Sequence, residues 1–226
     1  MSLQSALKAM GEQVASLVKD GSLIGLGSGS AVAAFVVALG ERVRKEKIIV
    51  SGVPSSIQVE QVASANGIKL EHSSRLTAID VVVDGADQVD ASYNMIKGGG
   101  GAHFREKVMI DASKQRIIVS DESKFVENLT RTVPVEVTSY SKDVVEGKLK
   151  ELGGKPHLRS LEKGYPYFTQ NGNLIFEADF GTIKYPREME MNLLKVPGII
   201  ANGLFTMHID TFFRARNDGK VDELTP

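Results

Sequence analysis

The sequence has no cysteine and few histidines, and both absences narrow the chemistry available to the chain. Zero cysteines among 226 residues exclude disulfide bonds and thiolate chemistry. The histidines are scattered without the spacing of metal ligands, and they are His72, His103, His157 and His208. We therefore expect no metal site and no cofactor, and we interpret each histidine as a surface or structural residue.

The chain also lacks an excess of charge of either sign and any long hydrophobic run. Its 27 basic and 28 acidic residues leave a formal charge of −1, so no global field recruits nucleic acid or an anionic membrane. The longest apolar run, "AVAAFVVAL" at 31–39, is too short to cross a bilayer, and "MSLQSALKAMGEQ" lacks a signal-peptide core. We expect a cytoplasmic protein that holds any anionic ligand in a local site.

Apolar residues in the first part of the chain alternate between helical and strand patterns. Helical spacing over 3–18, with Gly21 as a stop, predicts an amphipathic first helix. The segment "SLIGLGSGS" reads as a strand entering a glycine-rich turn, and 31–43 as a buried helix. The next pair is a strand in "KIIVSGV" and a helix in "SSIQVEQVASANG", opened by a capping pattern from Ser55 to Gln58 and closed near Gly67.

The clearest buried strand lies in "AIDVVVDGAD", whose continuous apolar run is typical of parallel sheets. A helix over 104–112 and a strand in "RIIVSD" follow it. Strands that alternate with helices predict a Rossmann-like, doubly wound parallel α/β sheet.

From about residue 131 the pattern changes. We expect a strand in "TVPVEVT", a helix over 142–152, a hairpin that turns at Asn171-Gly172, and a helix beginning at Pro186. Two final strands, in "GLFTMHI" and "TFFRAR", could return to either domain. We predict a Rossmann-like catalytic domain of residues 1–130 plus 205–226, and a smaller α+β domain of residues 131–204.

Ligands of open α/β sheets bind beyond the carboxyl ends of the strands, where three polar or glycine-rich segments lie in this sequence. The first, "GLGSGSA" at 25–31, offers backbone N–H groups and two serine hydroxyls at a helix N-terminus, which favours phosphate binding. An ordinary strand-to-helix turn is the alternative. The segment is a poor dinucleotide fingerprint, because Ser30 replaces the third glycine and "IIVSGV" ends without an acidic residue. A Walker A motif is absent.

The second and third segments carry charged side chains. In "DGAD", Asp84 and Asp87 follow the buried strand, and the alternative role is a helix cap or an aspartate-built turn. In "KGGGGAHFREK", Lys97 precedes four glycines, and we expect their N–H groups to be exposed to a ligand. A flexible surface loop is the alternative interpretation of the run. Glu106 lies just inside the next helix, and a solvated helical glutamate is its alternative interpretation.

Together these residues supply what is needed to move a proton next to a carbonyl group. A glutamate can serve as the base. Lysine and backbone N–H groups can stabilise the oxyanion of an enediolate, an effect worth roughly 100- to 1000-fold per donor. The combination points to isomerisation of an aldose to a ketose.

Six segments, in order and along nearly the whole chain, resemble the A-type ribose-5-phosphate isomerases. They are "GLGSGSA", "DVVVDGADQVD", "KGGGGAHFREK", "SDESK", "LGGKPHLR" and "VPGIIANGLF". The spacing from Asp84 to Asp87, Lys97 and Glu106 matches the catalytic set of that family without a gap. The resemblance implies a metal-independent isomerase that interconverts D-ribose 5-phosphate and D-ribulose 5-phosphate in the non-oxidative pentose phosphate pathway.

The resemblance also implies residue roles. Glu106 would transfer the proton between C1 and C2, and Asp84, Asp87 and Lys97 would act in ring opening and on the sugar oxygens. The implied substrate-binding residues are Ser28, Gly29, Ser30, Ala31, Gly85, Ala86, Gly98, Gly99, Gly100 and Lys124. A sugar phosphate would be the substrate, and the smaller domain would help to form a homodimer or homotetramer.

Two positions depart from the family pattern. Members often have threonine where Ser28 and Ala31 stand, so Ala31 can contribute only its backbone. Some members have a lysine at the position of Leu7, which the neighbouring Lys8 does not obviously replace. Both departures affect phosphate binding and not the identity of the base.

Two other function classes remain open at this point. A sugar-phosphate-sensing module of a transcription regulator would need the phosphate cradle but neither Glu106 nor Lys97, and the chain has no basic recognition helix. An NAD-dependent oxidoreductase would need the acidic residue that is missing after the second strand.

Overall fold

A mostly parallel sheet organises the first of the two units into which the chain divides. The computed structural model describes residues 2–71 and 73–226, so His72 lies outside the described residues. The first unit contains the described residues up to Ala86, then Arg105–Lys124 and His208–Pro226. Among described residues its sheet has seven strands: β1 (Leu23–Leu26), β2 (Ser51–Pro54), β3 (Lys69–Leu70), β4 (Val81–Asp84), β7 (Gln115–Asp121), β13 (Thr211–Ala215) and β14 (Val221–Leu224).

The strand order is β14-β13-β7-β4-β1-β2-β3. Neighbouring strands pair in parallel from β13 to β3, and only the edge pair β13–β14 of this described sheet is antiparallel. The predicted Rossmann-like α/β sheet is therefore confirmed.

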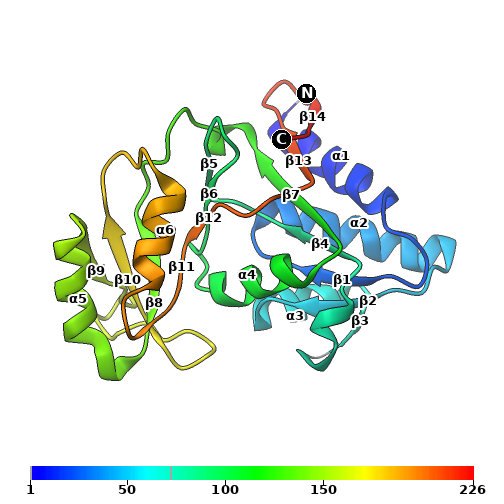
Figure 1. Ribbon diagram of the computed structural model, residues 1–226. Helices are drawn as coiled ribbons and strands as arrows, with labels where there is room; N and C mark the ends of the chain where they lie inside the picture. Colours follow the sequence, from blue (N-terminus) through cyan, green and yellow to red (C-terminus); the bar gives the residue numbers. More distant parts are fainter. Residues whose placement is uncertain (1, 72) are drawn as a thin grey trace. The chain divides into compact units, whose positions relative to one another are not determined.

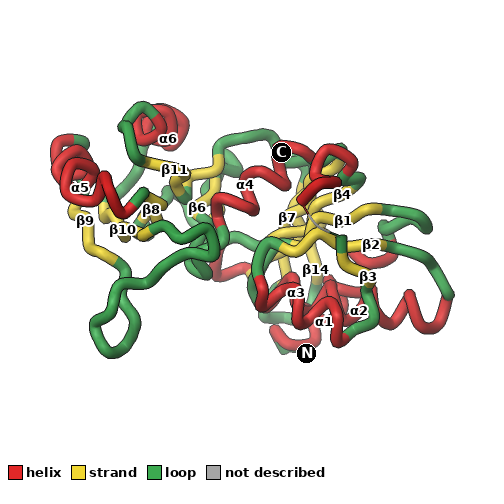
Figure 2. The backbone as a smooth tube through the Cα atoms, turned by 90° about the horizontal axis from the view of Figure 1, so that it is seen from below, coloured by secondary structure: helices red, strands yellow, loops and turns green. Residues whose placement is uncertain are grey.

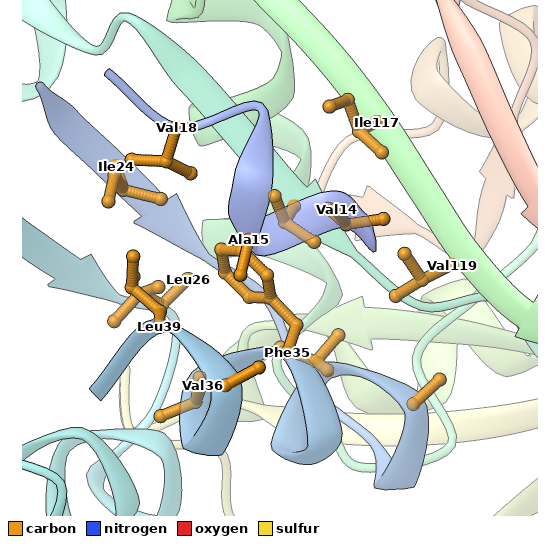
Figure 3. Packing of buried hydrophobic residues seen from close by; sticks show 14 of the residues in the cluster. Val14, Ala15, Val18, Ile24, Leu26, Phe35, Val36, Leu39, Ile117 and Val119 are labelled. Atoms are coloured by element: carbon orange, nitrogen blue, oxygen red, sulfur yellow. The ribbon is translucent and has the colours of Figure 1, made fainter. Parts of the chain in front are cut away.

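Four helices accompany this sheet in the described chain: α1 (Leu3–Ser16), α2 (Ser30–Glu46), α3 (Ile57–Ala65) and α4 (His103–Ala112). The first three lie on one side of the sheet and α4 on the other (Figure 2). Val14 of α1, Phe35 of α2 and Val119 of β7 pack in one buried cluster (Figure 3). Because strand side chains alternate between faces, Ile117 shares that cluster and the intervening Ile118, also buried, points to the opposite face.

The second unit comprises Asp87–Phe104 and Phe125–Met207 (Figure 1). Its four-stranded antiparallel sheet has the order β11-β8-β10-β9, with β8 (Val133–Val137), β9 (Lys155–Leu158), β10 (Leu174–Asp179) and β11 (Ile199–Asn202). A smaller antiparallel sheet has the order β12-β6-β5, with β5 (Gln88–Val89), β6 (Met95–Ile96) and β12 (Leu204–Phe205). Helices α5 (Lys142–Glu151) and α6 (Pro186–Leu194) lie on one face of the four-stranded sheet (Figure 2). The unit is α+β, as predicted from the texture of this part of the sequence.

Short 3-10 turns and caps complete the backbone. The 3-10 segments are η1 (Ser73–Ala78), η2 (Glu122–Lys124) and η3 (Ser139–Ser141). Helix α3 begins one residue later than the capping pattern suggested, because Ser56 and not Ser55 accepts the N–H of Val59, at 3.3 Å. Strand β2 likewise starts at Ser51, after the apolar residues that suggested an earlier start.

The hairpin turn at Asn171-Gly172 is confirmed, because Gly172 donates to the carbonyl of Thr169 at 2.9 Å and has a φ of +79°. The segment before the turn, however, makes only isolated bridges to its neighbours. Strand β10 pairs instead with β8 and β9. A local hairpin pattern therefore found the turn but not the partners of the strand.

The unit boundary differs from the expected division at residue 130. Residues 87–104 and 125–130 belong to the second unit, because β6 pairs with β12 and Gln88 binds the backbone of the 130–131 segment. The two final strands divide accordingly, since β12 joins the second unit and β13 the first.

Among the helices of the described chain, none is both long and apolar enough to span a membrane.

Candidate active site

The loop between β1 and α2 forms a tight cradle at the carboxyl edge of the first unit's sheet. A side chain at Gly27 would place its Cβ 2.0 Å from Oδ1 of Asp84, so only glycine fits there. Gly29 caps α2 with a φ of +101°, a conformation that favours glycine. Gly29 and Ser30 are exposed at the start of this 17-residue helix, whose first N–H groups and dipole attract an anion.

Ala31 is buried and its methyl group belongs to the hydrophobic core. Its only polar contribution at the helix start is therefore its backbone N–H group. This agrees with the sequence expectation that its contact is made by backbone alone.

Three neighbouring strands bring their carboxyl ends to this edge, in the order β7-β4-β1. The cradle follows β1, Asp84 ends β4, and Lys124 closes the η2 turn after β7. Two of the three predicted segments, the cradle and Asp84, therefore lie at this edge of the first unit's sheet, whereas the glycine run 98–101 belongs to the second unit.

Asp84 is fully buried, and its carboxylate shapes the cradle. Oδ1 accepts the N–H of Ser28 at 3.0 Å and the N–H of Gly85 at 2.7 Å. A Cβ on Gly85 would lie 2.8 Å from the carbonyl oxygen of Ser28, so this glycine permits close approach of two loops. The carbonyl of Ala86 accepts the hydroxyl of Ser120 at 3.3 Å. Asp84 thus has the turn-building role that was its alternative interpretation, in addition to any role toward a ligand.

Glu106 lies in the first turn of α4 and is 1% exposed. Its Oε1 accepts the hydroxyl of Ser28 at 2.6 Å. The interpretation as a solvated helical glutamate is therefore wrong, because a carboxylate is buried only where the fold provides partners for it. Ser28 joins two candidate residues, since its N–H binds Asp84 and its hydroxyl binds Glu106.

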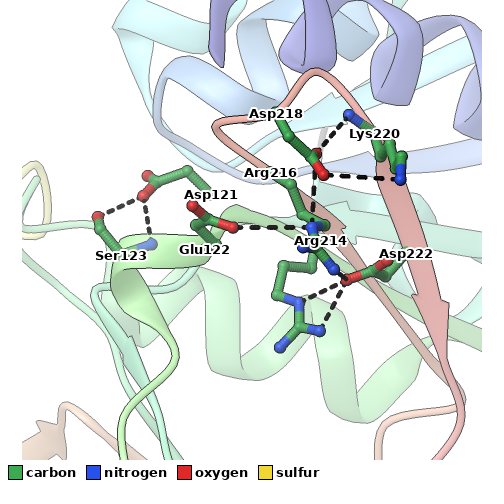
Figure 4. Close-up of polar contacts among 8 residues, drawn as sticks. All are labelled: Asp121, Glu122, Ser123, Arg214, Arg216, Asp218, Lys220 and Asp222. Carbon is green, nitrogen blue, oxygen red and sulfur yellow. Dashed lines mark hydrogen bonds and ion pairs between the residues drawn. The ribbon is translucent and has the colours of Figure 1, made fainter. Parts of the chain in front are cut away.

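Lys124 is half-buried and has no ion-pair or hydrogen-bond partner among the residues that the structure describes. The turn that presents it is held from two sides (Figure 4). Asp121 accepts the N–H of Ser123 at 2.9 Å, and Glu122 lies 3.9 Å from Arg216 of the β13–β14 hairpin. The contacts of the turn therefore leave the ammonium group of Lys124 available for an anion.

In the second unit, the glycine run 98–101 forms an ordered turn. Gly98 and Gly101 have φ values of +105° and +77°, and the N–H of Gly101 donates to the carbonyl of Gly98 at 2.9 Å. The N–H of Gly99 donates to Oδ2 of Asp87 at 2.8 Å. The sequence suggested that all four N–H groups are presented to a ligand. The structure differs, because the N–H groups of Gly99 and Gly101 bind within the protein. Gly99 and Gly100 are the exposed members of the run.

Lys97 is 2% exposed, and its ammonium nitrogen lies 5.4 Å from the centroid of the Phe205 ring. Its N–H donates to the carbonyl of Gly203 at 2.9 Å, which ties the residue to the segment before β12. A cation over an aromatic face is stabilised by the ring quadrupole. The fold therefore holds a positive charge beside the glycine run.

His103 is buried against Gly98, whose Cβ would lie 2.8 Å from its ring nitrogen Nδ1, whereas His157 and His208 are exposed. These positions agree with structural and surface roles. Within the described part of the chain, no group of three or more histidine, cysteine, aspartate or glutamate residues is arranged to hold a metal ion.

Asp80, at the opposite end of β4 from Asp84, shows how a purely structural carboxylate differs from these residues. The Lys114 ammonium at 2.8 Å and the N–H of Leu23 hold the pKa of Asp80 below its usual value. This pair is partly exposed at the edge of the sheet away from the cradle.

Sequence reasoning identified Ser28 and Glu106 as site residues but missed the contact between them. The two residues are 78 positions apart, and no local pattern couples them. Ser28 was expected to bind phosphate, whereas its hydroxyl is directed to the glutamate.

Comparisons with known proteins point in one direction. The family described as ribose 5-phosphate isomerase A (phosphoriboisomerase A) matches residues 51–219. A ribose-5-phosphate isomerase A of Methanosarcina acetivorans is 40% identical over 219 residues, which cover 96% of this chain and 93% of the relative.

Solved structures of the same name share the whole fold. The ribose 5-phosphate isomerase A of Methanocaldococcus jannaschii has a TM-score of 0.92 at 34% identity, with 99% of each chain covered. A D-ribose-5-phosphate isomerase in complex with phospho-erythronic acid has a TM-score of 0.94 at 34% identity, with 100% of each chain covered.

Proposed function

Since the chain belongs to the ribose 5-phosphate isomerase A family and interconverts D-ribose 5-phosphate and D-ribulose 5-phosphate, we propose that Glu106 is its catalytic base. The observation that carries this proposal is the burial of the Glu106 carboxylate with its Oε1 held by the Ser28 hydroxyl at 2.6 Å. A base must be oriented before it can remove a proton from carbon, and this hydrogen bond holds one oxygen of the carboxylate in place.

The reaction requires one proton to move between neighbouring carbons. In the open-chain aldose, Glu106 removes the proton from C2, and the electrons form an enediolate with the C1 carbonyl. The protonated Glu106 then returns the proton to C1, while the proton of the C2 hydroxyl passes to O1, which leaves the C2 carbonyl of the ketose. No net proton is gained or lost, and one carboxylate suffices for the transfer between the two carbons.

The enediolate carries negative charge on its oxygens, which a cation and backbone N–H groups are suited to stabilise. Lys97 supplies a buried cation, and the exposed part of the glycine run, Gly99 and Gly100, lets a sugar oxygen approach the backbone. Asp87, held by the N–H of Gly99, is oriented to accept or donate at a sugar hydroxyl during ring opening. Asp84 would act in the same step. The structure of a relative with phospho-erythronic acid supports this chemistry, because the carboxylate of such a ligand resembles the enediolate in shape and charge.

The phosphate is best placed at the start of α2. The exposed backbone of Gly29 and Ser30, the N–H of Ala31 and the Lys124 ammonium supply donors for a dianion. Both donors of Ser28 are engaged within the protein, because its N–H binds Asp84 and its hydroxyl binds Glu106.

Two further statements belong to the same proposal. The enzyme acts in the cytoplasm, in the non-oxidative pentose phosphate pathway. It also forms a homodimer or homotetramer through the second unit, which is supported by large apolar side chains on that unit's surface, such as the fully exposed Tyr140 and the 71% exposed Tyr185. Light scattering on the purified protein would measure the subunit number, and a monomer at micromolar concentration would contradict this part.

The proposal as a whole is tested by following ribulose 5-phosphate formation from ribose 5-phosphate with the wild-type protein and with Glu106→Gln. Loss of kcat with retained binding of phospho-erythronic acid supports it. Loss of binding alone, with kcat retained, contradicts it.

A further inference from the structure

We propose that Arg159 is a positioning residue that holds the glycine run 98–101, and through it Asp87, in working orientation. Arg159 stands at the end of "LGGKPHLR", a segment to which the reaction itself assigns no task. Its side chain is 15% exposed, and its Nη2 donates to the carbonyl oxygen of Gly98 at 3.0 Å. This inference rests on the proposed role of Asp87.

The guanidinium group is itself fixed by a carboxylate and a ring. Nε donates to Oε1 of Glu177 at 2.6 Å, and Oε2 of Glu177 accepts the hydroxyl of Thr132 at 3.1 Å. The Tyr167 ring lies with its centroid 5.4 Å from the guanidinium carbon. Because the planar group donates in two directions at once, a lysine ammonium cannot reproduce both bonds in the same geometry.

The contact with Gly98 controls more than one atom. The carbonyl of Gly98 and the N–H of Gly99 belong to one rigid peptide plane and point in opposite directions. Arg159 holds the carbonyl on one side, so the N–H on the other side is directed to Asp87, which it meets at 2.8 Å. Arg159 therefore sets the orientation of the Asp87 carboxylate without contacting it.

A run of four glycines needs such an external hold. Glycine has the largest backbone freedom of any residue, and two of these four adopt positive φ. Besides the internal bond from Gly101 to Gly98, the carbonyl of Gly100 lies 3.4 Å from the Tyr167 hydroxyl. Arg159 and Tyr167 thus hold two carbonyls of the run, those of Gly98 and Gly100, and the charged contact is the shorter and stronger one.

The test compares Arg159→Lys with a matched substitution elsewhere. Arg42 has the same kind of environment, because its guanidinium binds Glu46 at 2.8 Å and the backbone carbonyl of Val18 at 2.8 Å, with 21% exposure. It lies in α2, twelve residues and roughly 18 Å from Ser30. Arg42→Lys therefore removes similar contacts at a residue of the first unit that does not contact the glycine run.

We expect Arg159→Lys to lower kcat roughly 10- to 100-fold, the size of effect that a small misplacement of a catalytic group produces, with KM within about twofold. Binding of phospho-erythronic acid should weaken in step with kcat/KM, whereas binding of inorganic phosphate stays unchanged. Arg42→Lys should lower the melting temperature by about as much as Arg159→Lys does, and it should leave kcat at the wild-type value. Tyr167→Phe should cost only a few-fold in kcat because its contact is long, and Tyr165→Phe, at an exposed position, should cost nothing.

A kcat for Arg159→Lys within twofold of wild type overturns the inference, as does an equal loss of kcat in Arg42→Lys. Should Arg159→Lys fail to fold, Glu177→Gln gives the same reading, because it loosens the guanidinium while keeping Arg159. Asp87→Asn separates this inference from the proposed function. Normal turnover in Asp87→Asn contradicts the role of Asp87, whereas a depressed Asp87→Asn beside a normal Arg159→Lys overturns the inference alone.

Discussion

Replacing Ser28 with alanine distinguishes two roles for this residue. Its hydroxyl binds Glu106 at 2.6 Å, while its N–H binds Asp84 at 3.0 Å and survives the substitution. A hydrogen bond to a charged group contributes about 1.5–3 kcal/mol, which corresponds to a factor of roughly 13 to 160. We expect Ser28→Ala to lose kcat within that range, because the carboxylate loses its orienting partner, with little change in KM for ribose 5-phosphate.

Steady-state kinetics of ribulose 5-phosphate formation measure both constants. Ser30→Ala removes the same atom from the exposed first residue of α2, and we expect it to raise KM and to preserve kcat. Ser28→Thr keeps a hydroxyl and should retain most of the turnover. If Ser28→Ala raised KM at unchanged kcat, its hydroxyl would bind the phosphate and the reasoning about Glu106 would be refuted.

Three further results are expected. Lys124→Ala should raise KM more than it lowers kcat, since a remote phosphate is bound similarly in ground and transition states; an unchanged KM would remove Lys124 from the site. Activity should survive prolonged chelation, because we propose that Lys97 carries the electrophilic role; loss with EDTA and recovery with a divalent ion would contradict this. Gly99→Val should reduce kcat roughly 100- to 1000-fold, because its Cβ would lie 3.0 Å from Oδ1 of Asp87. Gly147→Val is the control and should be neutral, because a Cβ there meets nothing within 4 Å. Equal activity of the two variants would refute the need for a bare backbone.

Local patterns in the sequence were sufficient for much of the fold. The buried strand β4 was predicted from its continuous apolar run, and the start of α6 from its proline. Both could be predicted because hydrophobic periodicity and proline geometry depend only on neighbouring residues. Strands of two residues, such as β3 and β5, are too short to show a period and were missed. The placement of 87–104 depends on pairing of β6 with a strand about 110 residues later, which no local signal reports.

The candidate site was predictable in its members and not in its contacts. Asp84 was identified at the end of a buried strand, because parallel strands bring their carboxyl ends to one edge, whereas Lys97 and Glu106 were identified by the glycine-rich segment between them. The burial of Glu106 and its bond to Ser28 depend on tertiary packing, so this residue taken in isolation favoured a solvated side chain, and only its neighbours in the sequence pointed to a base. Arg159 was part of a recognised segment, but only the structure showed its bond to Gly98.

The central claim is that Glu106 transfers the proton, and the turnover of Glu106→Gln tests it most directly. Glutamine keeps the size of the side chain and removes the proton-accepting charge, so kcat should fall by at least about 100-fold while phospho-erythronic acid still binds. Glu188→Gln is the matched control, because Glu188 occupies the first turn of α6 as an exposed residue, and it should turn over at the wild-type rate. Near-native turnover in Glu106→Gln would contradict the account and transfer the role of base to Asp84 or Asp87.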